Sequence, residues 1–187
     1  LLQVARALVD AEEAGIVHRD LKPENIFLGE TPDGSDFAKV MDFGVARVAP
    51  KAGDTAESLE TSSMVVGTPR YMAPEQIRGG DVGPKADLYA LGCLLYFLIT
   101  GAPPYERDDN FAVMEAHLKA PIPPLPKQDI KGAIVPSSMV DLYFELMAKQ
   151  PRGRPSGARA ALRQLSRIRD DIRAGVEGLS SPSSRAS

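Results

Sequence analysis

The chain has 187 residues, of which 43% are hydrophobic and 25% are charged, as in an ordinary globular domain large enough to bury a core. Its formal net charge of −3 gives no electrostatic reason to expect nucleic acid or a membrane surface as a partner, and no targeting segment is visible. The single cysteine, Cys93, excludes an intrachain disulfide, and its apolar neighbours predict a buried core position that is compatible with a reducing cytoplasm.

One helix and one small hairpin are expected at the start of the chain. Apolar residues at helical spacing predict a helix over residues 1–14, and Gly15 is a natural helix stop. Strand candidates at 26–28 and 37–41 flank the turn residues 31–35. The chain starts with Leu rather than Met, so we expect this start to be a cut and not a natural terminus.

The middle of the chain divides into a long loop and a buried helix. Residues 42–75 show no periodicity and are rich in Gly, Pro, Ser and Thr, which predicts a loop that is either functional or disordered. Pro84 and Gly101 bracket a predicted helix over residues 85–100. Its apolar run is shorter than the roughly 20 residues that cross a bilayer, so we expect a core helix and no membrane segment.

Helices and loops are expected in the last part of the chain. A short helix is predicted near residues 110–118, followed by a proline-rich loop over 120–136. Ser137 or Ser138 is expected to cap a helix that runs to Lys149, and Ser156 to cap another that runs to about Arg173. The pattern predicts one mostly helical domain over residues 1–173 and a Ser-rich, disordered tail over 174–187.

The strongest chemical signal is an eight-residue segment between the first helix and the hairpin. It reads His18-Arg19-Asp20-Leu21-Lys22-Pro23-Glu24-Asn25. Phosphoryl transfer needs a carboxylate to orient and deprotonate a hydroxyl, a cation for the phosphate charge, and an oxygen ligand for magnesium. An acid, a lysine and an asparagine within six residues supply all three.

Four further segments follow in order along the chain. They are Asp42-Phe43-Gly44 after a strand, Gly67-Thr68-Pro69-Arg70-Tyr71-Met72-Ala73-Pro74-Glu75, Asp87 at the start of the apolar helix, and Arg154-Pro155. A carboxylate at the end of a strand, followed by glycine, is a reasonable magnesium site, although three residues alone are a weak match. The order and separation of all five segments together are highly specific.

The set resembles the ordered motifs of eukaryotic-type (Hanks-type) serine/threonine protein kinases, including those of bacteria. The resemblance runs from Leu1 to about Arg173, and Lys22, two positions after Asp20, follows the serine/threonine pattern. It implies the α+β protein kinase-like fold, represented here by its C-terminal lobe, which is mostly α-helical with a small β-hairpin. It also implies transfer of the γ-phosphate of ATP to Ser and Thr hydroxyls of protein substrates.

The resemblance implies a role for each matching residue. Asp20 is expected to act as the catalytic base, and Lys22 to steady the transferred phosphoryl group. Asn25 and Asp42 are expected to bind Mg²⁺, so that with Lys22 they form the ATP·Mg²⁺ site. Thr68 is expected to pack beside Asp20 and shape the acceptor site.

Other matching residues are expected to be structural or regulatory. His18 and Phe43, with Gly44, are expected to pack. Glu75 and Arg154 are expected to form a buried ion pair. Asp87 is expected to accept hydrogen bonds from the backbone of the catalytic loop, residues 18–25. Arg19 is expected to pair with a phosphate in the activation segment, the stretch that ends at Ala73-Pro74-Glu75. The acceptor candidates are Thr55, Ser58, Thr61, Ser62 and Ser63, of which Thr61 and Ser62 are favoured; the alternative is that these are ordinary loop residues.

The sequence departs from the family in one large respect. The glycine-rich loop, the strand lysine and the helix glutamate of a kinase N-terminal lobe are not found in these 187 residues. We therefore expect the isolated chain to be inactive and the N-terminal lobe to be a required partner. The alternative functions are a truncated kinase or pseudokinase acting as a scaffold, and a helical interaction domain with accidental motifs.

A cytoplasmic location is expected for this chain. In bacterial members of the family the kinase domain is often joined to sensor or membrane segments beyond its C-terminus. The Ser-rich tail is either the start of such a linker or a frayed end.

Overall fold

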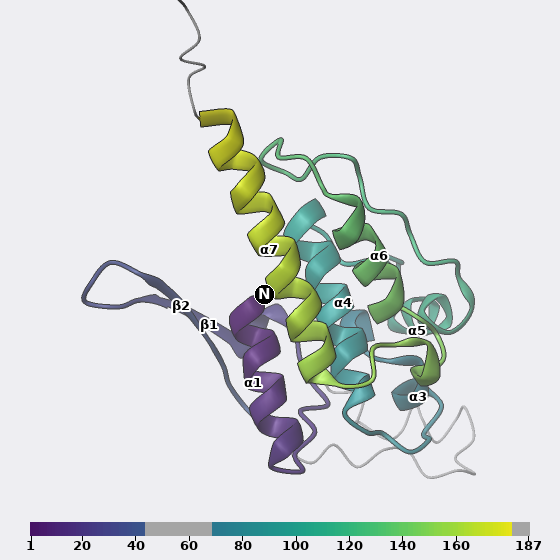
Figure 1. Cartoon of the computed structure of the whole chain (residues 1–187). Helices are drawn as coiled ribbons and strands as arrows, with labels where there is room; N and C mark the ends of the chain where they lie inside the picture. The colour runs from purple at the N-terminus through teal and green to yellow at the C-terminus, as the bar shows by residue number, and fades with distance from the viewer. Residues whose placement is uncertain (44–68, 181–187) are drawn as a thin grey trace, which may run out of the picture.

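Helix α4 (Lys85–Thr100) forms the centre of the protein, with all ten residues from 86 to 95 buried. The computed structural model describes residues 1–43 and 69–180. The bounds of α4 are those predicted, because Pro84 precedes it and Gly101, with a φ of +78°, ends it in the left-handed conformation that glycine adopts without strain. Helices α6 (Ser137–Leu146) and α7 (Ala158–Ser180) pack against α4 (Figure 1).

The contact between α4 and α6 depends on a glycine. A Cβ atom at Gly92 would lie 2.9 Å from the Cβ of Leu146 and 3.1 Å from the Cγ of Met147, so only glycine allows this approach. The neighbouring Cys93 is fully buried, which confirms the predicted core position, and burial raises the pKa of its thiol. Each large apolar side chain buried here contributes about 1.5–3 kcal/mol relative to an exposed one.

Helix α1 (Leu2–Glu13) lies alongside the first half of α7 (Figure 1). The backbone N–H of Ala158, the first residue of α7, donates to the Glu12 carboxylate at 2.7 Å. The prediction that Ser156 caps this helix was wrong. The free backbone N–H group at the start of α7 is instead bonded to the carboxylate of Glu12, on α1.

A two-stranded antiparallel sheet projects from the helices (Figure 1). Strands β1 (Ile26–Glu30) and β2 (Asp36–Val40) pair with Ile26 opposite Val40, as the predicted hairpin requires. The side-chain amide of Gln3 on α1 donates to the Asp36 carbonyl at 3.1 Å and accepts from the Ala38 N–H, so it extends the hydrogen bonding of β2 toward α1.

Smaller elements complete the described ranges. They are helix α5 (Asn110–Lys119), the four-residue helix α3 (Pro74–Ile77), and the 3₁₀ turns η1 (Pro23–Asn25), η2 (Pro69–Tyr71) and η3 (Pro151–Gly153). Residues 120–136 form the predicted loop, with one isolated bridge between Gln128 and Ile134. The turn η2 and the first two residues of α3 fall within the predicted loop 42–75, since elements this short leave no periodic signal.

The predicted ends of the last two long helices were wrong. Neither Ser137 nor Ser138 caps α6, because Pro136 occupies the cap position and no side-chain bond forms there. Helix α6 stops at Leu146 instead of Lys149, and the freed Ala148 carbonyl accepts from Arg154 at 2.9 Å.

Helix α7 continues to Ser180, past the predicted end near Arg173 and through the first residues of the predicted tail. Gly175 and Gly178 are tolerated within it. Pro182 is the first proline after Pro155, and helices usually end at or before the residue that precedes a proline. The division of the chain at residue 173 stays a prediction.

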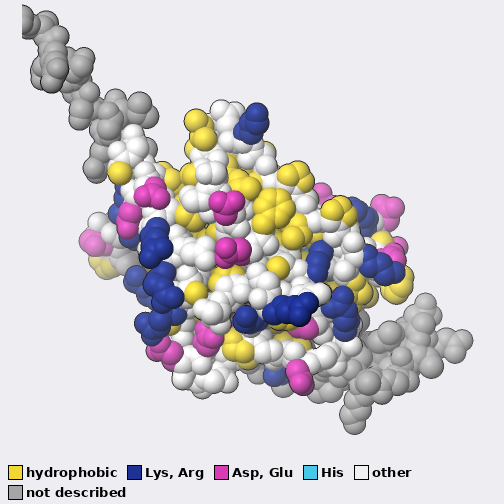
Figure 2. Space-filling model, turned by 45° about the vertical axis from the view of Figure 1, so that its right-hand side comes forward, with side chains coloured by type: hydrophobic (Ala, Val, Ile, Leu, Met, Phe, Trp, Pro, Cys, Tyr) yellow, Lys and Arg dark blue, Asp and Glu magenta, His cyan; other side chains and the backbone are white. Residues whose placement is uncertain are grey.

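The outer surface mixes charged and apolar side chains. Figure 2 shows Lys, Arg, Asp and Glu around apolar side chains that remain exposed. None of the helices within residues 1–43 and 69–180 has the length and apolar character needed to cross a membrane.

Candidate active site

The segment from His18 to Asn25 lies between α1 and β1 and is anchored to the core by Asp87. The Asp87 carboxylate, buried at the start of α4, accepts from the backbone N–H of His18 at 2.8 Å and of Arg19 at 2.9 Å. Burial raises the pKa of Asp87, and the two N–H donors act in the opposite direction. The central helix thus fixes the backbone just before Asp20.

Arg19 has an unusual backbone conformation. Its φ of +66° lies in the left-handed region, which costs a residue with a side chain about 1–3 kcal/mol. The conformation is held from both sides, because Asp87 accepts from the Arg19 N–H while the Gln76 side chain donates to the Arg19 carbonyl at 2.7 Å. The Arg19 side chain itself is exposed.

Three of the predicted catalytic side chains meet at Asp20. The Lys22 ammonium lies 2.9 Å from the Asp20 Oδ2 atom. The Asn25 amide nitrogen donates to the Asp20 carbonyl at 2.7 Å and to its Oδ2 atom at 3.3 Å. The Asp20 side chain keeps 30% of its surface exposed, so an incoming hydroxyl group can reach it.

Asp42 and Phe43 follow β2 and are tied to the same segment. The Met41 N–H donates to the Asn25 carbonyl at 2.9 Å, and the Met41 carbonyl lies 2.8 Å from the His18 Nε2 atom. The Phe43 ring lies 4.8 Å from the His18 ring. Asp42 is exposed and, with a φ of +58°, turns the chain directly after these contacts.

The contacts of His18 define its tautomer. Its Nδ1 atom accepts from the Asp20 N–H at 3.3 Å, and its Nε2 atom faces the Met41 carbonyl. Both contacts are satisfied by the tautomer that carries its proton on Nε2. His18 is almost fully buried, so the structure gives it a packing and hydrogen-bonding position rather than an exposed one.

The side chains of Asn25 and Asp42 carry oxygen atoms of the kind that Mg²⁺ binds. Mg²⁺ is usually bound through one or two protein oxygen ligands together with waters and phosphates. Asn25 directs its amide nitrogen to Asp20, so its Oδ1 atom is the part that can ligate a metal, and Asp42 supplies a carboxylate. No cluster of three or more His, Cys, Asp or Glu suited to a metal occurs in the parts of the chain that the structure describes.

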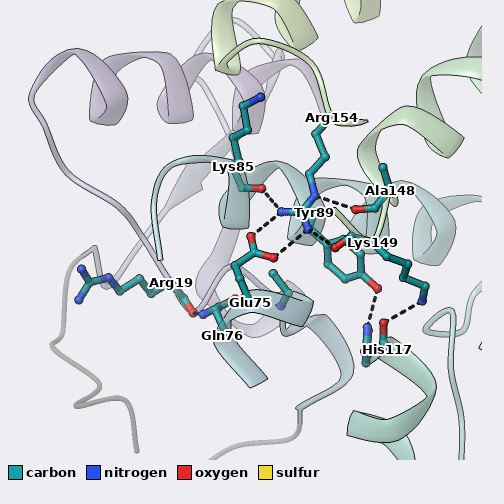
Figure 3. Close-up of polar contacts among 10 residues, drawn as sticks. Arg19, Glu75, Gln76, Lys85, Tyr89, His117, Ala148, Lys149 and Arg154 are labelled. Atoms are coloured by element: carbon teal, nitrogen blue, oxygen red, sulfur yellow. Dashed lines mark hydrogen bonds and ion pairs between the residues drawn. The ribbon is translucent and has the colours of Figure 1, made fainter. Parts of the chain in front are cut away.

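Glu75 and Arg154 form a buried ion pair between α3 and the segment after η3 (Figure 3). Arg154 donates from Nη1 to Glu75 Oε1 at 2.5 Å and from Nη2 to Oε2 at 2.9 Å. The Arg154 side chain is fully buried, and it also donates to the carbonyls of Lys85 at 2.7 Å and Ala148 at 2.9 Å. The pair joins α3 to the core.

A polar cluster that the sequence did not reveal lies next to this pair (Figure 3). The Arg154 guanidinium stacks 4.9 Å from the centre of the Tyr89 ring, and the Tyr89 hydroxyl lies 2.9 Å from the His117 Nδ1 atom. The Lys149 ammonium donates to the His117 carbonyl and to the Tyr105 hydroxyl, both at 2.8 Å. Burial lowers the pKa of Lys149 to about 8.

His117 is expected to make stability depend on pH. Burial, with the nearby Lys149 charge, lowers its pKa from 6.5 to about 3. As the pH falls, the unfolded chain binds this proton first, so the free energy of unfolding decreases from about pH 6.5 toward pH 3, with a slope of up to about 1.36 kcal/mol per pH unit. We expect a His117→Gln variant to show a shallower slope in urea unfolding between pH 4.5 and 6.5. Equal slopes in the two proteins would contradict this.

Several predicted residues lie outside the described residues. They are Gly44, Thr68 and the phosphorylation candidates Thr55, Ser58, Thr61, Ser62 and Ser63. The structure instead adds Gln76 beside the catalytic loop, and Tyr89, His117 and Lys149 beside the Glu75–Arg154 pair. No local sequence signal could have identified them, since each acts through a partner far away in the chain.

Comparisons with known proteins show what this chain is similar to. A family model described as "Protein kinase domain" matches residues 1–165. Serine/threonine-protein kinase pkn3 of Myxococcus xanthus is 40% identical over 166 residues, which cover 89% of this chain and 30% of that protein. The probable serine/threonine-protein kinase PknB of Corynebacterium glutamicum is 38% identical over 171 residues, covering 90% of this chain and 25% of that protein.

A further relative is serine/threonine-protein kinase PknD of Mycobacterium tuberculosis. It is 42% identical over 152 residues, which cover 81% of this chain and 21% of that protein. The chain therefore spans less than a third of the length of these three relatives.

Proposed function

This chain belongs to the protein kinase family, and on that premise we propose that it forms the C-terminal lobe of a serine/threonine kinase that transfers the γ-phosphate of ATP to proteins. The observation that carries the proposal is the meeting of Lys22 and Asn25 at the Asp20 carboxylate, within 2.9 and 3.3 Å. A base, a cation and a metal ligand in contact are what phosphoryl transfer needs.

Each residue then has a defined task. Asp20 accepts the proton of the substrate hydroxyl as that oxygen attacks the γ-phosphate. Lys22 holds the Asp20 carboxylate in place and offers positive charge to the phosphoryl group. Asn25 and Asp42 would hold Mg²⁺, which would neutralise charge on the phosphates of ATP, and Thr68 is proposed to contribute to the acceptor site.

The surrounding residues keep this arrangement rigid. Asp87 and His18 fix the backbone on either side of Arg19, and Phe43 packs on His18 so that Asp42 stays near the loop. Positioning supplies much of the rate in phosphoryl transfer, so such supports matter as much as the reacting groups. We propose that Arg19, which is exposed, pairs with a phosphate on Thr61 or Ser62.

The proposal includes partners that complete the enzyme. Protein substrates and a kinase N-terminal lobe are required, since the C-terminal lobe forms only one wall of a nucleotide cleft. We place the reaction in the cytoplasm, where ATP is available.

The test is phosphate transfer by the natural full-length protein. With γ-labelled ATP and Mg²⁺, we expect label on Ser and Thr of a test protein, and no label when EDTA removes the metal. The 187-residue chain alone is expected to be inactive in the same assay. Absence of label, or label that persists in EDTA, would contradict the proposal and favour a scaffold.

A further inference from the structure

We propose that Gln76, on helix α3, is a positioning residue that orients the peptide group between Arg19 and Asp20, so that the base is aligned only when α3 is in place. The inference rests on the proposed function, because it concerns the orientation of the same Asp20. Gln76 directly follows Glu75, and the structure shows its side chain reaching from α3 to the catalytic loop (Figure 3).

Both the nitrogen and the oxygen of the Gln76 side-chain amide form hydrogen bonds. Its nitrogen donates to the Arg19 carbonyl at 2.7 Å, and its oxygen accepts from the Ala73 N–H at 2.9 Å. The second bond lies within the first turn of α3 and fixes the direction of the side chain. With the direction of the side chain fixed, the amide nitrogen of Gln76 points to the Arg19 carbonyl.

That carbonyl belongs to the peptide group that leads into Asp20. The Arg19 carbonyl and the Asp20 N–H lie in one rigid plane, so a bond to the oxygen also sets the direction of the N–H. The Asp20 N–H of the same peptide group donates to the His18 Nδ1 atom in a longer hydrogen bond of 3.3 Å. The bond from Gln76 is thus the shorter of these two.

The backbone here needs such support. Arg19 has a φ of +66°, a conformation that persists in a residue with a side chain only when neighbours hold it. Asp87 holds the Arg19 N–H on one side, from the central helix. Gln76 on α3 donates to the Arg19 carbonyl on the other side. Helices α4 and α3 therefore both fix the backbone of Arg19.

The position of helix α3 depends on Glu75, the residue before Gln76. Glu75 is locked to the buried Arg154, which is itself bonded to the Lys85 and Ala148 carbonyls. A shift of α3 away from Arg154 would pull the Gln76 amide from the Arg19 carbonyl. The orientation of Asp20 is therefore linked to the position of the segment that ends at α3.

Two variants of Gln76 separate its two bonds. Gln76→Glu keeps an acceptor for the Ala73 N–H but replaces the donor with a carboxylate oxygen facing the Arg19 carbonyl. Gln76→Lys keeps a donor for Arg19 and loses the acceptor for Ala73. The matched control is Gln164→Glu, because Gln164 on α7 donates to the Glu145 carboxylate at 3.0 Å, far along the chain from the catalytic loop.

The experiment measures kinetics and amide hydrogen exchange on the natural full-length protein. We expect Gln76→Glu to lower kcat by about 10-fold or more, with the KM for ATP within about twofold of wild type, since misplacing a reacting group by about 1 Å can cost about 10²-fold. Gln164→Glu is expected to keep the wild-type kcat, and Gln76→Lys, which keeps a donor for the Arg19 carbonyl, is expected to lose less than Gln76→Glu. The catalytic-loop peptide should exchange faster in Gln76→Glu alone.

The outcomes distinguish this inference from the proposed function. If wild type transfers phosphate and Gln76→Glu matches it in kcat, or if Gln76→Lys falls as far as Gln76→Glu, the inference is overturned while the function stands. Equal loss of thermal stability in both Gln76 variants with unchanged kcat would show a merely structural role. If wild type shows no transfer, the proposed function is wrong. Unchanged hydrogen exchange of the catalytic-loop peptide in Gln76→Glu would then also show that Gln76 does not orient the peptide group between Arg19 and Asp20.

Discussion

An Arg154→Met variant is expected to lose about 3–5 kcal/mol of its free energy of unfolding. Methionine fills much of the same space, but it leaves the Glu75 carboxylate, which is only 12% exposed, without its positive partner. It also removes the donors that bond to the Lys85 and Ala148 carbonyls. Since domains of this kind are stable by about 5–15 kcal/mol, the loss would be a large share of the total.

The measurement is urea unfolding of wild type, Arg154→Met and an Arg167→Met control. Arg167 is exposed on α7, so the same substitution there should change the free energy of unfolding by less than about 0.5 kcal/mol. Adding Glu75→Gln to Arg154→Met should recover part of the loss, because it removes the stranded charge. A loss in Arg154→Met no larger than in the control would show that the pair does not hold α3 to the core.

The sequence was most informative where a feature is local. Pro84 and Gly101 gave the bounds of α4, and the turn residues 31–35 gave the hairpin, because each acts on its own backbone. The grouping of Asp20, Lys22 and Asn25 could also be expected, since the three lie within six residues. The resemblance to kinases added Asp87, which the structure places against the catalytic loop.

Contacts between distant segments could not be predicted. The Glu12 carboxylate accepts from the backbone N–H at the start of α7, 146 positions away in the chain. No residue near Ser156 indicated that this serine would not be the helix cap. Gln76 and Arg19 are 57 positions apart, and Tyr89 and His117 are 28 apart. Such pairs are set by how helices pack, and a single sequence carries no periodic or motif signal for them.

An Asp20→Asn variant is expected to lower kcat by about 10²–10⁴-fold. Asparagine has nearly the same shape, and its oxygen can still accept from Lys22, which now lies 2.9 Å from the carboxylate. An amide cannot take the proton of the attacking hydroxyl, so the substitution removes the base while the fold and the affinity for ATP remain. Asp141→Asn, an exposed carboxylate on α6, provides a control with the same chemical change.

The most direct test of the whole account compares these proteins in one assay. Natural full-length wild type, Asp20→Asn and Asp141→Asn are each given γ-labelled ATP, Mg²⁺ and a test protein, and the initial rate of labelling of Ser and Thr is measured. The account predicts full activity in wild type and Asp141→Asn, with near-complete loss in Asp20→Asn and unchanged thermal unfolding. Undiminished labelling by Asp20→Asn would contradict it, because the reaction would then use another base or another site.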